Sequence, residues 1–366
     1  MRAILVGAGH AHLHVMNHAS RFTADGHELI VVAPDIFWYS GLATGMLGGI
    51  HPPELDRINP AHVLGGSGRF IMDRVVGLDL NNRVLELAKG ISLDFDVLSI
   101  DLGSNVRPIP GTTHRRVFAV KPIRNLCDLR SEIELLARSD QTRRWRIAIA
   151  GGGVTAFEVA TNLVSRVHQC GGATDVNIYA SDNKPLAQLP KRAARRILQY
   201  SAEQDITLRP GSHVERIDDG ELHLSNGETF PFDIFVNATG LIPSTSLRHL
   251  GLELNEEGAL VVDSCLQARG VRGVFAGGDC IAFKGEQLPK LGVFAIRQAP
   301  ILLHNLRATL AGRPLRQFHP QKHYLSIMAL GNGRGLAVRG SWWWEGRAAF
   351  WLKDFLDRRF LRSMDG

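Results

Sequence analysis

A short pattern near the start of this 366-residue chain restricts its fold more than any other feature, because the chain contains the pattern twice. An apolar run at residues 3–6 ends in a Gly-x-Gly turn at Gly7 and Gly9. A helical stretch follows from His10 to about residue 24, and then a second apolar run at residues 28–33. Strand, glycine turn, helix and strand form the βαβ unit of dinucleotide-binding domains. Its glycines permit a tight turn and the close approach of a pyrophosphate.

The second copy begins with the apolar run at residues 146–150 and the turn at Gly151 and Gly153. A helical stretch at residues 154–169 and an apolar run at residues 176–179 complete it. Either copy alone also fits an ordinary glycine-rich turn of an α/β domain. Two copies in one chain predict two nucleotide-binding units.

Three further apolar runs support this organisation. Residues 96–104 and 233–240 each open with an Asp and end in a Gly bend, and each follows one of the glycine-rich units. Residues 273–280 form a buried strand that ends at Asp279, whose carboxylate can accept a hydrogen bond from a sugar hydroxyl. The expected carboxylate site therefore lies in the C-terminal third of the chain.

Composition narrows the classes of function. Lys and Arg exceed Asp and Glu by 42 to 36, a net charge of +6, which suits anionic cofactors or an anionic membrane surface but does not indicate nucleic acid. The four cysteines lie far apart, which argues against a disulfide scaffold or a zinc site and favours a reducing, cytoplasmic compartment. The sequence predicts neither a signal peptide nor a membrane-spanning segment.

The order of these motifs resembles the flavoproteins of the pyridine nucleotide-disulfide oxidoreductase superfamily, in particular the branch of type II NADH dehydrogenases and sulfide:quinone reductases. The resemblance implies an α/β fold with two Rossmann-like domains (the glutathione-reductase-like FAD/NAD(P)-binding fold) and a C-terminal segment. Some motifs also resemble a subgroup that is sometimes fused to selenophosphate synthetase, a domain absent here. These motifs are residues 7–13, 39–41, 292–298 and 352–358.

The implied domains are a discontinuous FAD-binding domain at residues 1–115 and 260–335, an NAD(P)-binding domain at 116–259, and an amphipathic or capping segment at 336–366. The implied activity is hydride transfer from NAD(H) or NADP(H) to FAD and then to a quinone or another small electron acceptor. Two alternatives stay open. One is sulfur or selenium oxidation at the same flavin, and the other is a flavin-binding protein with a degenerate nicotinamide site.

The resemblance also implies site residues. Glu158 and Cys280 are the candidate catalytic residues. The nicotinamide nucleotide is expected at Gly151, Gly153, Val154, Thr155, Thr239 and Gly240. The FAD is expected at Gly7, Gly9, His10, Ala11, Ala33, Ser40, Gly41, Val75, Leu102, Gly103, Gly278, Asp279, Leu291, Gly292 and Val293.

Several positions depart from the family pattern. His12 stands where the first motif expects its third glycine, and Ala33 stands where an acid usually binds the adenosine ribose. Ala180 and Ser181 follow the second unit and are neither the acid typical of NAD nor the Arg typical of NADP, so the choice of nucleotide stays open. No cysteine pair follows the first turn, which excludes disulfide reduction.

Two clusters have competing interpretations. His10, His14 and His18 share a helix face, but packing or phosphate contact is favoured there and no metal is predicted. Aromatic and basic side chains alternate at helical spacing between Trp351 and Arg362, after three consecutive tryptophans. This stretch fits a membrane interface on the inner face of the cell membrane, a cap on the flavin domain, or a homodimer contact.

Overall fold

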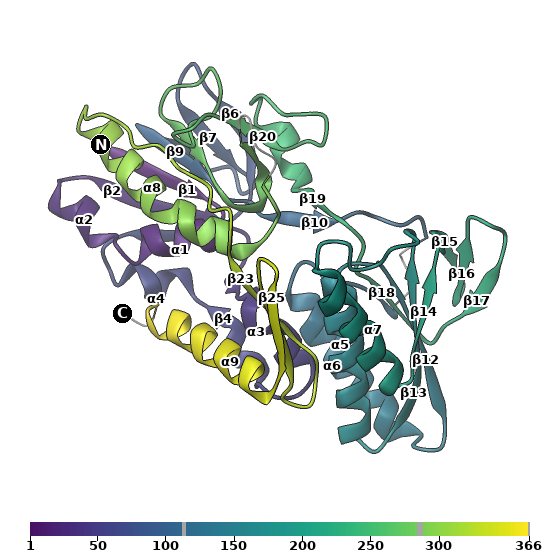
Figure 1. The fold of residues 1–366 in the computed structure, drawn as a ribbon. Helices are drawn as coiled ribbons and strands as arrows, with labels where there is room; N and C mark the ends of the chain where they lie inside the picture. Colours follow the sequence, from purple (N-terminus) through teal and green to yellow (C-terminus); the bar gives the residue numbers. More distant parts are fainter. Residues whose placement is uncertain (112–114, 284–287, 365–366) are drawn as a thin grey trace.

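The computed structural model describes residues 1–111, 115–283 and 288–364, and it shows two parallel sheets with helices packed against them (Figure 1). The first sheet has the strand order β21-β9-β1-β2-β5. Its strands are β1 (Arg2–Val6), β2 (Glu28–Ala33), β5 (Arg69–Met72), β9 (Val97–Ile100) and β21 (Val274–Ala276). The predicted α/β class with two Rossmann-like units is confirmed.

The second sheet has the order β11-β18-β12-β13-β14, and all its pairs are parallel. Its strands are β11 (Val117–Ala119), β12 (Arg144–Ala150), β13 (Ala173–Ala180), β14 (Ile206–Pro210) and β18 (Ile234–Asn237). The helices of this half are α5 (Arg124–Ser139), α6 (Val154–Gln169) and α7 (Lys191–Glu203). Residues 3–6 of β1, 29–33 of β2 and 147–150 of β12 are continuous apolar runs, as expected for strands of a parallel sheet that is covered on both faces.

The chain passes between the two sheets at two antiparallel strands, β10 (Ser104–Val106) and β19 (Leu241–Pro243). The boundary expected near residue 115 adjoins residues 112–114, which lie outside the described residues. After β19 the chain returns to the first half, because Leu247, Leu250 and Leu252 already pack in the core of that half, ahead of β20 (Leu260–Val262). The boundary expected at residue 260 stays a prediction.

Helix α1 (His10–Met16) begins directly after the first glycine turn and packs beside α8 (Gly292–Leu310). His12 replaces the expected glycine and is fully buried. Its Nδ1 lies 2.6 Å from the carbonyl of Gly7 and therefore donates to it, while its Nε2 accepts from the Ser99 hydroxyl at 2.8 Å. Burial lowers the pKa of His12 to about 4, so the ring is neutral. The imidazole thus ties the helix to the glycine turn and to strand β9.

The remaining elements are short. They are α2 (Ser20–Ala24), β3 (Phe37–Trp38), α3 (Ser40–Leu47), η1 (Pro53–Asp56), β4 (Arg57–Ile58), α4 (Pro60–Leu64), β6 (Val75–Asp79), β7 (Val84–Leu87), β8 (Ser92–Asp94), β15 (Val214–Asp218), β16 (Glu221–Leu224), β17 (Thr229–Pro231), η2 (Thr245–His249), η3 (Gly278–Cys280) and β22 (Ile281–Phe283).

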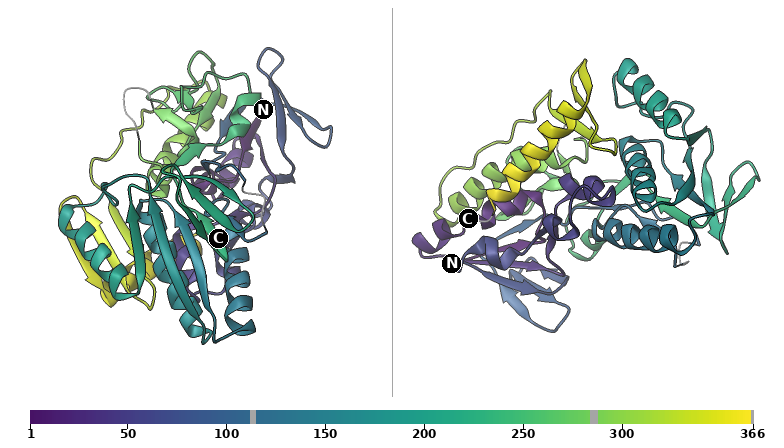
Figure 2. Two further views of the ribbon diagram at one scale, coloured as in Figure 1. Left: turned by 90° about the vertical axis from the view of Figure 1, so that its right-hand side faces the viewer. Right: turned by 90° about the horizontal axis from the view of Figure 1, so that it is seen from below.

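The C-terminal part forms a three-stranded antiparallel sheet followed by a long helix, which lies beside the N-terminal helices in the view from below (Figure 2). The elements are β23 (Leu325–Ala329), β24 (Gly335–Arg339), β25 (Trp342–Gly346) and α9 (Arg347–Arg362). The three tryptophans lie on a strand, so Trp342 and Trp344 face outward while Trp343 packs inward. Residues 365–366 of the expected segment lie outside the described residues.

Candidate active site

Two cavities lie near the crossing strands β10 and β19. The smaller lies between the two halves, and the larger lies between the second half and residues 322–340 of the C-terminal part. The larger has a volume of about 880 Å³, and it is lined by every residue expected to bind the nicotinamide nucleotide: Gly151, Gly153, Val154, Thr155, Thr239 and Gly240. The smaller has a volume of about 350 Å³. Most of the residues expected to bind the flavin line it, namely Gly9, His10, Ser40, Gly41, Leu102, Gly103, Gly278, Asp279, Leu291 and Gly292.

Thr155, Glu158, Leu241 and Leu291 line both cavities. Two of these residues come from the first turns of α6, one from the crossing strand β19, and one from the residue that precedes α8. The cavities therefore adjoin at these four residues, and Glu158 is part of the wall that they share.

The other predicted residues lie elsewhere. Gly7 forms the turn at φ +90°, where an added Cβ would overlap the Asp101 carbonyl. Cys280 is fully buried, and its thiol lies 3.2 Å from the Gly277 carbonyl rather than in either cavity. Burial also raises the pKa of this thiol, which favours packing over redox chemistry. The remaining predicted residues outside the smaller cavity are Ala11, Ala33, Val75 and Val293.

A cation holds the Asp279 carboxylate in the smaller cavity. Lys121 Nζ donates to Asp279 Oδ2 at 2.8 Å, and the Ser104 hydroxyl donates to the same oxygen at 2.7 Å. Burial opposes ionisation of Asp279, but Lys121 and Ser104 outweigh it and hold the pKa below its usual range. Asp279 is therefore an anionic acceptor at neutral pH, suited to a ligand hydroxyl.

Glu158 lies where the two halves meet the C-terminal sheet. Its Oε1 accepts from the Ala329 amide at 2.8 Å and lies 3.5 Å from the Thr44 hydroxyl. Burial raises the pKa of Glu158, against the opposing effects of Lys353 and the Ala329 amide. The carboxyl is thus held by residues of three separate parts of the chain.

Helix α9 contributes to the smaller cavity through Lys353. The Lys353 ammonium donates to the Gly41 carbonyl and to Asp357 Oδ2, and Tyr39 donates its hydroxyl to Asp357 Oδ1 at 2.8 Å. The inward face of α9 is therefore part of the cavity wall and of the packing around it.

A second buried carboxylate occupies the glycine turn of the first unit. Asp101 Oδ2 accepts from the Ala11 amide at 2.9 Å, and an added Cβ at Gly9 would overlap this carboxyl group. Burial raises the pKa of Asp101 to about 7, although the Ala11 amide opposes the shift. Gly7 and Gly9 are thus required because a larger side chain would overlap Asp101, in addition to blocking a ligand at the turn.

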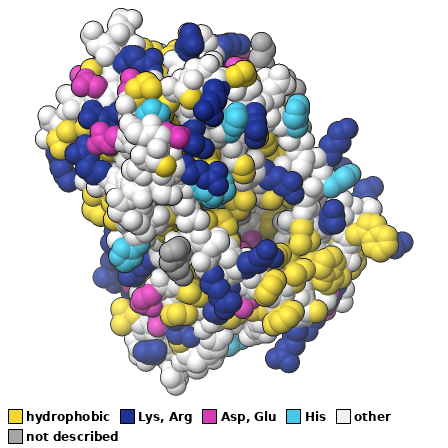
Figure 3. Space-filling view, turned by 90° about the vertical axis from the view of Figure 1, so that its left-hand side faces the viewer, with side chains coloured by type: hydrophobic (Ala, Val, Ile, Leu, Met, Phe, Trp, Pro, Cys, Tyr) yellow, Lys and Arg dark blue, Asp and Glu magenta, His cyan; other side chains and the backbone are white. Residues whose placement is uncertain are grey.

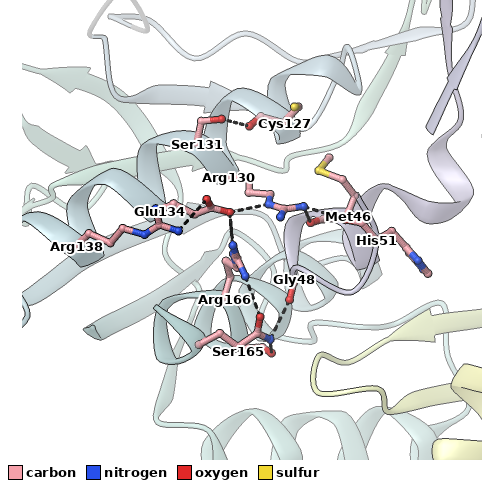
Figure 4. Close-up of polar contacts among 11 residues, drawn as sticks. Met46, Gly48, His51, Cys127, Arg130, Ser131, Glu134, Arg138, Ser165 and Arg166 are labelled. Carbon is pink, nitrogen blue, oxygen red and sulfur yellow. Dashed lines mark hydrogen bonds and ion pairs between the residues drawn. The ribbon is translucent and has the colours of Figure 1, made fainter. Parts of the chain in front are cut away.

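A polar cluster fixes the two halves to each other (Figure 4). Arg130 of α5 donates to the carbonyls of Met46 and His51 at the end of α3. Glu134 accepts from Arg130 at 2.7 Å and from Arg166 of α6 at 2.5 Å. This cluster holds α3, which carries Thr44, against α6, which carries Glu158.

The residues fit FAD in the smaller cavity and a nicotinamide nucleotide in the larger one. The indole Nε1 of Trp38 is buried without a partner among the described residues, and Trp38 lines the smaller cavity. In the larger cavity, a Cβ added at Gly153 would meet only Gln188 Nε2, at 3.5 Å, so open space lies before this turn. The described residues contain no group of three metal-ligating side chains.

Sequence reasoning missed Lys121, Thr44, Lys353 and Asp101 as residues of this region. None of them belongs to a glycine motif, and the sequence around Lys353 indicates only an amphipathic helix. Asp101 had a local signal, because it directly precedes the bend at Leu102 and Gly103.

Comparisons with known proteins agree with this geometry. A family model described as pyridine nucleotide-disulphide oxidoreductase matches residues 1–299. Ferroptosis suppressor protein 1 of Xenopus laevis is 27% identical over 263 residues, which cover 69% of this chain and 66% of that protein. Demethylphylloquinone reductase NdbB of Synechocystis is 25% identical over 368 residues, which cover 93% of this chain and 88% of the relative.

A solved structure, NDH2 from Plasmodium falciparum in complex with NADH, superposes with a TM-score of 0.82 at 14% identity. The match covers 100% of this chain and 97% of that one. At this identity the likeness concerns the fold. The matched stretch spans just under two thirds of the length of the Xenopus relative.

Proposed function

This chain belongs to the pyridine nucleotide-disulphide oxidoreductase family, and from that premise we propose that it transfers a hydride from NADH or NADPH to FAD and then passes the electrons to a quinone. The observation that carries the proposal is the pair of adjoining cavities that share Thr155, Glu158, Leu241 and Leu291. Bound FAD would supply the two-electron redox centre between donor and acceptor.

The residues of the chain position the two ligands. The open turn at Gly153 would receive the nucleotide phosphates, and the wall that both cavities share beside Glu158 would lie between the two ligands' reacting ends. Asp279, kept ionised by Lys121, would accept a hydrogen bond from a flavin hydroxyl. The role of this chain is therefore mainly to orient the two ligands.

A quinone is the proposed acceptor because relatives of this chain include a demethylphylloquinone reductase. A lipid-soluble acceptor requires access to a bilayer, and no described helix is long and apolar enough to cross one. We therefore propose that the protein docks on the surface of an anionic membrane.

The outward face of α9 and strand β25 supply the docking surface. Trp342, Trp351 and Phe355 are 81%, 71% and 49% exposed, and the Arg359 and Arg362 side chains are exposed beside them. Figure 3 shows hydrophobic and basic side chains next to each other on the face of the molecule that carries this helix. Exposed tryptophan favours the headgroup region, and each basic residue near an anionic surface adds about 1 kcal/mol.

The experiment that tests hydride transfer uses the Gly153→Val variant. The protein leaves room for an added Cβ at Gly153, so the variant should fold and keep its FAD, while the valine should block the phosphates. Anaerobic NADH or NADPH should bleach the flavin of the wild type and fail with the valine variant, and Gly153→Ala should be intermediate. A valine variant that is reduced as fast as the wild type would show that the turn does not bind the nucleotide.

A further inference from the structure

The turn at residues 151–155, assigned above to the nucleotide phosphates, carries no positive side chain. It consists of three glycines, a valine and a threonine, and it offers backbone amides at the N-terminus of α6. The N-terminus of a helix is equivalent to about half a positive charge, whereas a pyrophosphate carries two negative charges. Most of that charge is therefore left for side chains on other walls of the larger cavity to balance.

Among the described residues, one arginine and two lysines line the larger cavity, namely Arg107, Lys184 and Lys322. Lys184 follows β13, where the adenosine ribose of a nucleotide lies in this type of unit. Arg107 and Lys322 lie on other walls, and neither forms an ion pair with a described residue. These two side chains are the candidates for the missing positive charge.

The backbone of Arg107 is fixed beside the glycine turn. Its amide donates to the Gly240 carbonyl at 3.2 Å, and its carbonyl accepts from Asn237 Nδ2 at 2.9 Å. Asn237 ends β18 and lies opposite Ala150 of β12, the residue before the turn. Arg107 is thus attached one strand away from Gly151, at the carboxyl end of the sheet, where nucleotides bind.

Lys322 reaches the same cavity from the C-terminal part of the chain. Two residues later, the Tyr324 ring packs edge-on against Phe294 of α8, with the ring centroids 5.5 Å apart. Strand β23 begins at the next residue, Leu325, and pairs with β24. The segment that carries Lys322 is therefore held against the first half and the C-terminal sheet.

Carboxyl groups of the cavity wall do not neutralise these two cations. The wall contains Glu158, Asp182 and Glu215, and in the described structure none of them forms an ion pair with Arg107 or Lys322. Asp182 follows β13, and Glu215 lies on β15. Both cations are thus available to an anionic group that enters the cavity.

We propose that Arg107 and Lys322 bind the pyrophosphate of the nicotinamide nucleotide from two walls of the larger cavity, so that the C-terminal part completes the nucleotide site. The inference rests on the proposed function, in which this cavity holds NADH or NADPH. The arginine can hold a phosphate through two parallel N–H···O bonds, and the lysine acts as a point charge. The glycine turn orients the phosphates, and the two cations balance their charge.

The test is calorimetric titration of the FAD-loaded full chain with NAD⁺, NADP⁺ and ADP-ribose, which all contain the pyrophosphate. None of these probes reduces the flavin, so binding is measured without turnover. Arg107→Gln and Lys322→Gln change exposed side chains and should fold. Each should weaken binding of all three probes by about three- to tenfold, and the loss should shrink as the salt concentration rises.

The matched controls are Lys191→Gln and Arg195→Gln. These residues are exposed on α7 and line neither cavity, so their substitution removes the same charge and should leave binding unchanged.

The three probes distinguish the positions that the two cations could take. A loss confined to NADP⁺ would place them at the 2′-phosphate, and a loss that spares ADP-ribose would place them at the nicotinamide end. Either result would overturn the proposal, as would unchanged affinity in Arg107→Gln or in Lys322→Gln. A wild type that binds none of the probes would contradict the proposed function and this inference together.

Discussion

The ammonium of Lys121 lies 2.8 Å from the Asp279 carboxylate, although the two residues are 158 positions apart and follow strands of different sheets. Lys121 comes after β11 of the second sheet, and Asp279 comes after β21 of the first. The ion pair therefore joins the two halves of the molecule at the wall of the smaller cavity.

This pair predicts the effect of Asp279→Asn. The asparagine cannot accept a charge-assisted hydrogen bond from a flavin hydroxyl, so FAD affinity should fall by about 1.5–3 kcal/mol. The measurement is FAD retention during dialysis, followed by titration of the apoprotein. The matched control is Asp263→Asn, because Asp263 caps a turn outside both cavities. Equal FAD affinity in the wild type and Asp279→Asn would exclude Asp279 from the flavin site.

The cluster in Figure 4 predicts the effect of Glu134→Ala. The change leaves the partly buried guanidinium groups of Arg130 and Arg166 without their carboxylate, which should lower the free energy of unfolding by about 3 kcal/mol. Urea unfolding measures the difference. Glu203→Ala removes a more exposed partner of Arg196 and should cost about 1 kcal/mol or less. Equal losses in the two variants would contradict the proposed difference.

Asp101 predicts a pH dependence of stability. Its pKa in the folded protein is raised from 3.8 to about 7, so between these values the folded state binds more protons than the unfolded state. The contribution of Asp101 to the free energy of unfolding is therefore complete below about pH 4, and it is lost as the pH rises through 7. Asp101→Asn keeps an acceptor for Ala11 without the charge.

The measurement is the difference in unfolding free energy between Asp101→Asn and the wild type at pH 5 and at pH 8. The effect of pH on the other carboxyl groups is the same in both proteins and cancels in this difference. The asparagine variant should gain stability relative to the wild type at the higher pH. A difference that does not change with pH would show that Asp101 has an ordinary pKa.

The docking surface predicts that Trp351→Ser combined with Phe355→Ser abolishes sedimentation with anionic liposomes at low salt, while FAD stays bound. Point variants are preferable to deletion of the helix, because Lys353 and Asp357 on its inward face belong to the cavity wall. Leu135→Ser is the matched control, since Leu135 is 62% exposed on α5 of the other half. A wild-type protein that ignores liposomes would favour a soluble acceptor.

The sequence predicted the site residues that belong to short motifs, and it missed those that approach the site only through tertiary packing. The two glycine turns and Asp279 have local signals, since a strand that breaks into Gly-x-Gly or ends in an acid is visible within ten residues. Lys121 and Thr44 have no such signal, because they reach the site only through the packing of the two halves.

For two residues, His12 and Lys353, the sequence did not indicate the contacts that the side chain makes in the fold. In the sequence, His12 is an unfavourable replacement for glycine, yet its ring nitrogens bond Gly7 and Ser99 and so replace close packing with hydrogen bonds. In the sequence, Lys353 is a basic residue of an amphipathic helix, but its ammonium points to Gly41 and Asp357. Helical spacing identifies which residues share one face of a helix, but it does not indicate which part of the protein that face contacts.

Hydride transfer to the flavin is tested most directly by anaerobic mixing of the FAD-loaded wild type with NADH or NADPH that carries deuterium at the transferred position. If a hydride passes from the nucleotide to the flavin, the visible absorbance of oxidised flavin should disappear, and the deuterated nucleotide should reduce the flavin more slowly than the unlabelled one. An absorbance that neither nucleotide changes would contradict hydride transfer between the two adjoining cavities.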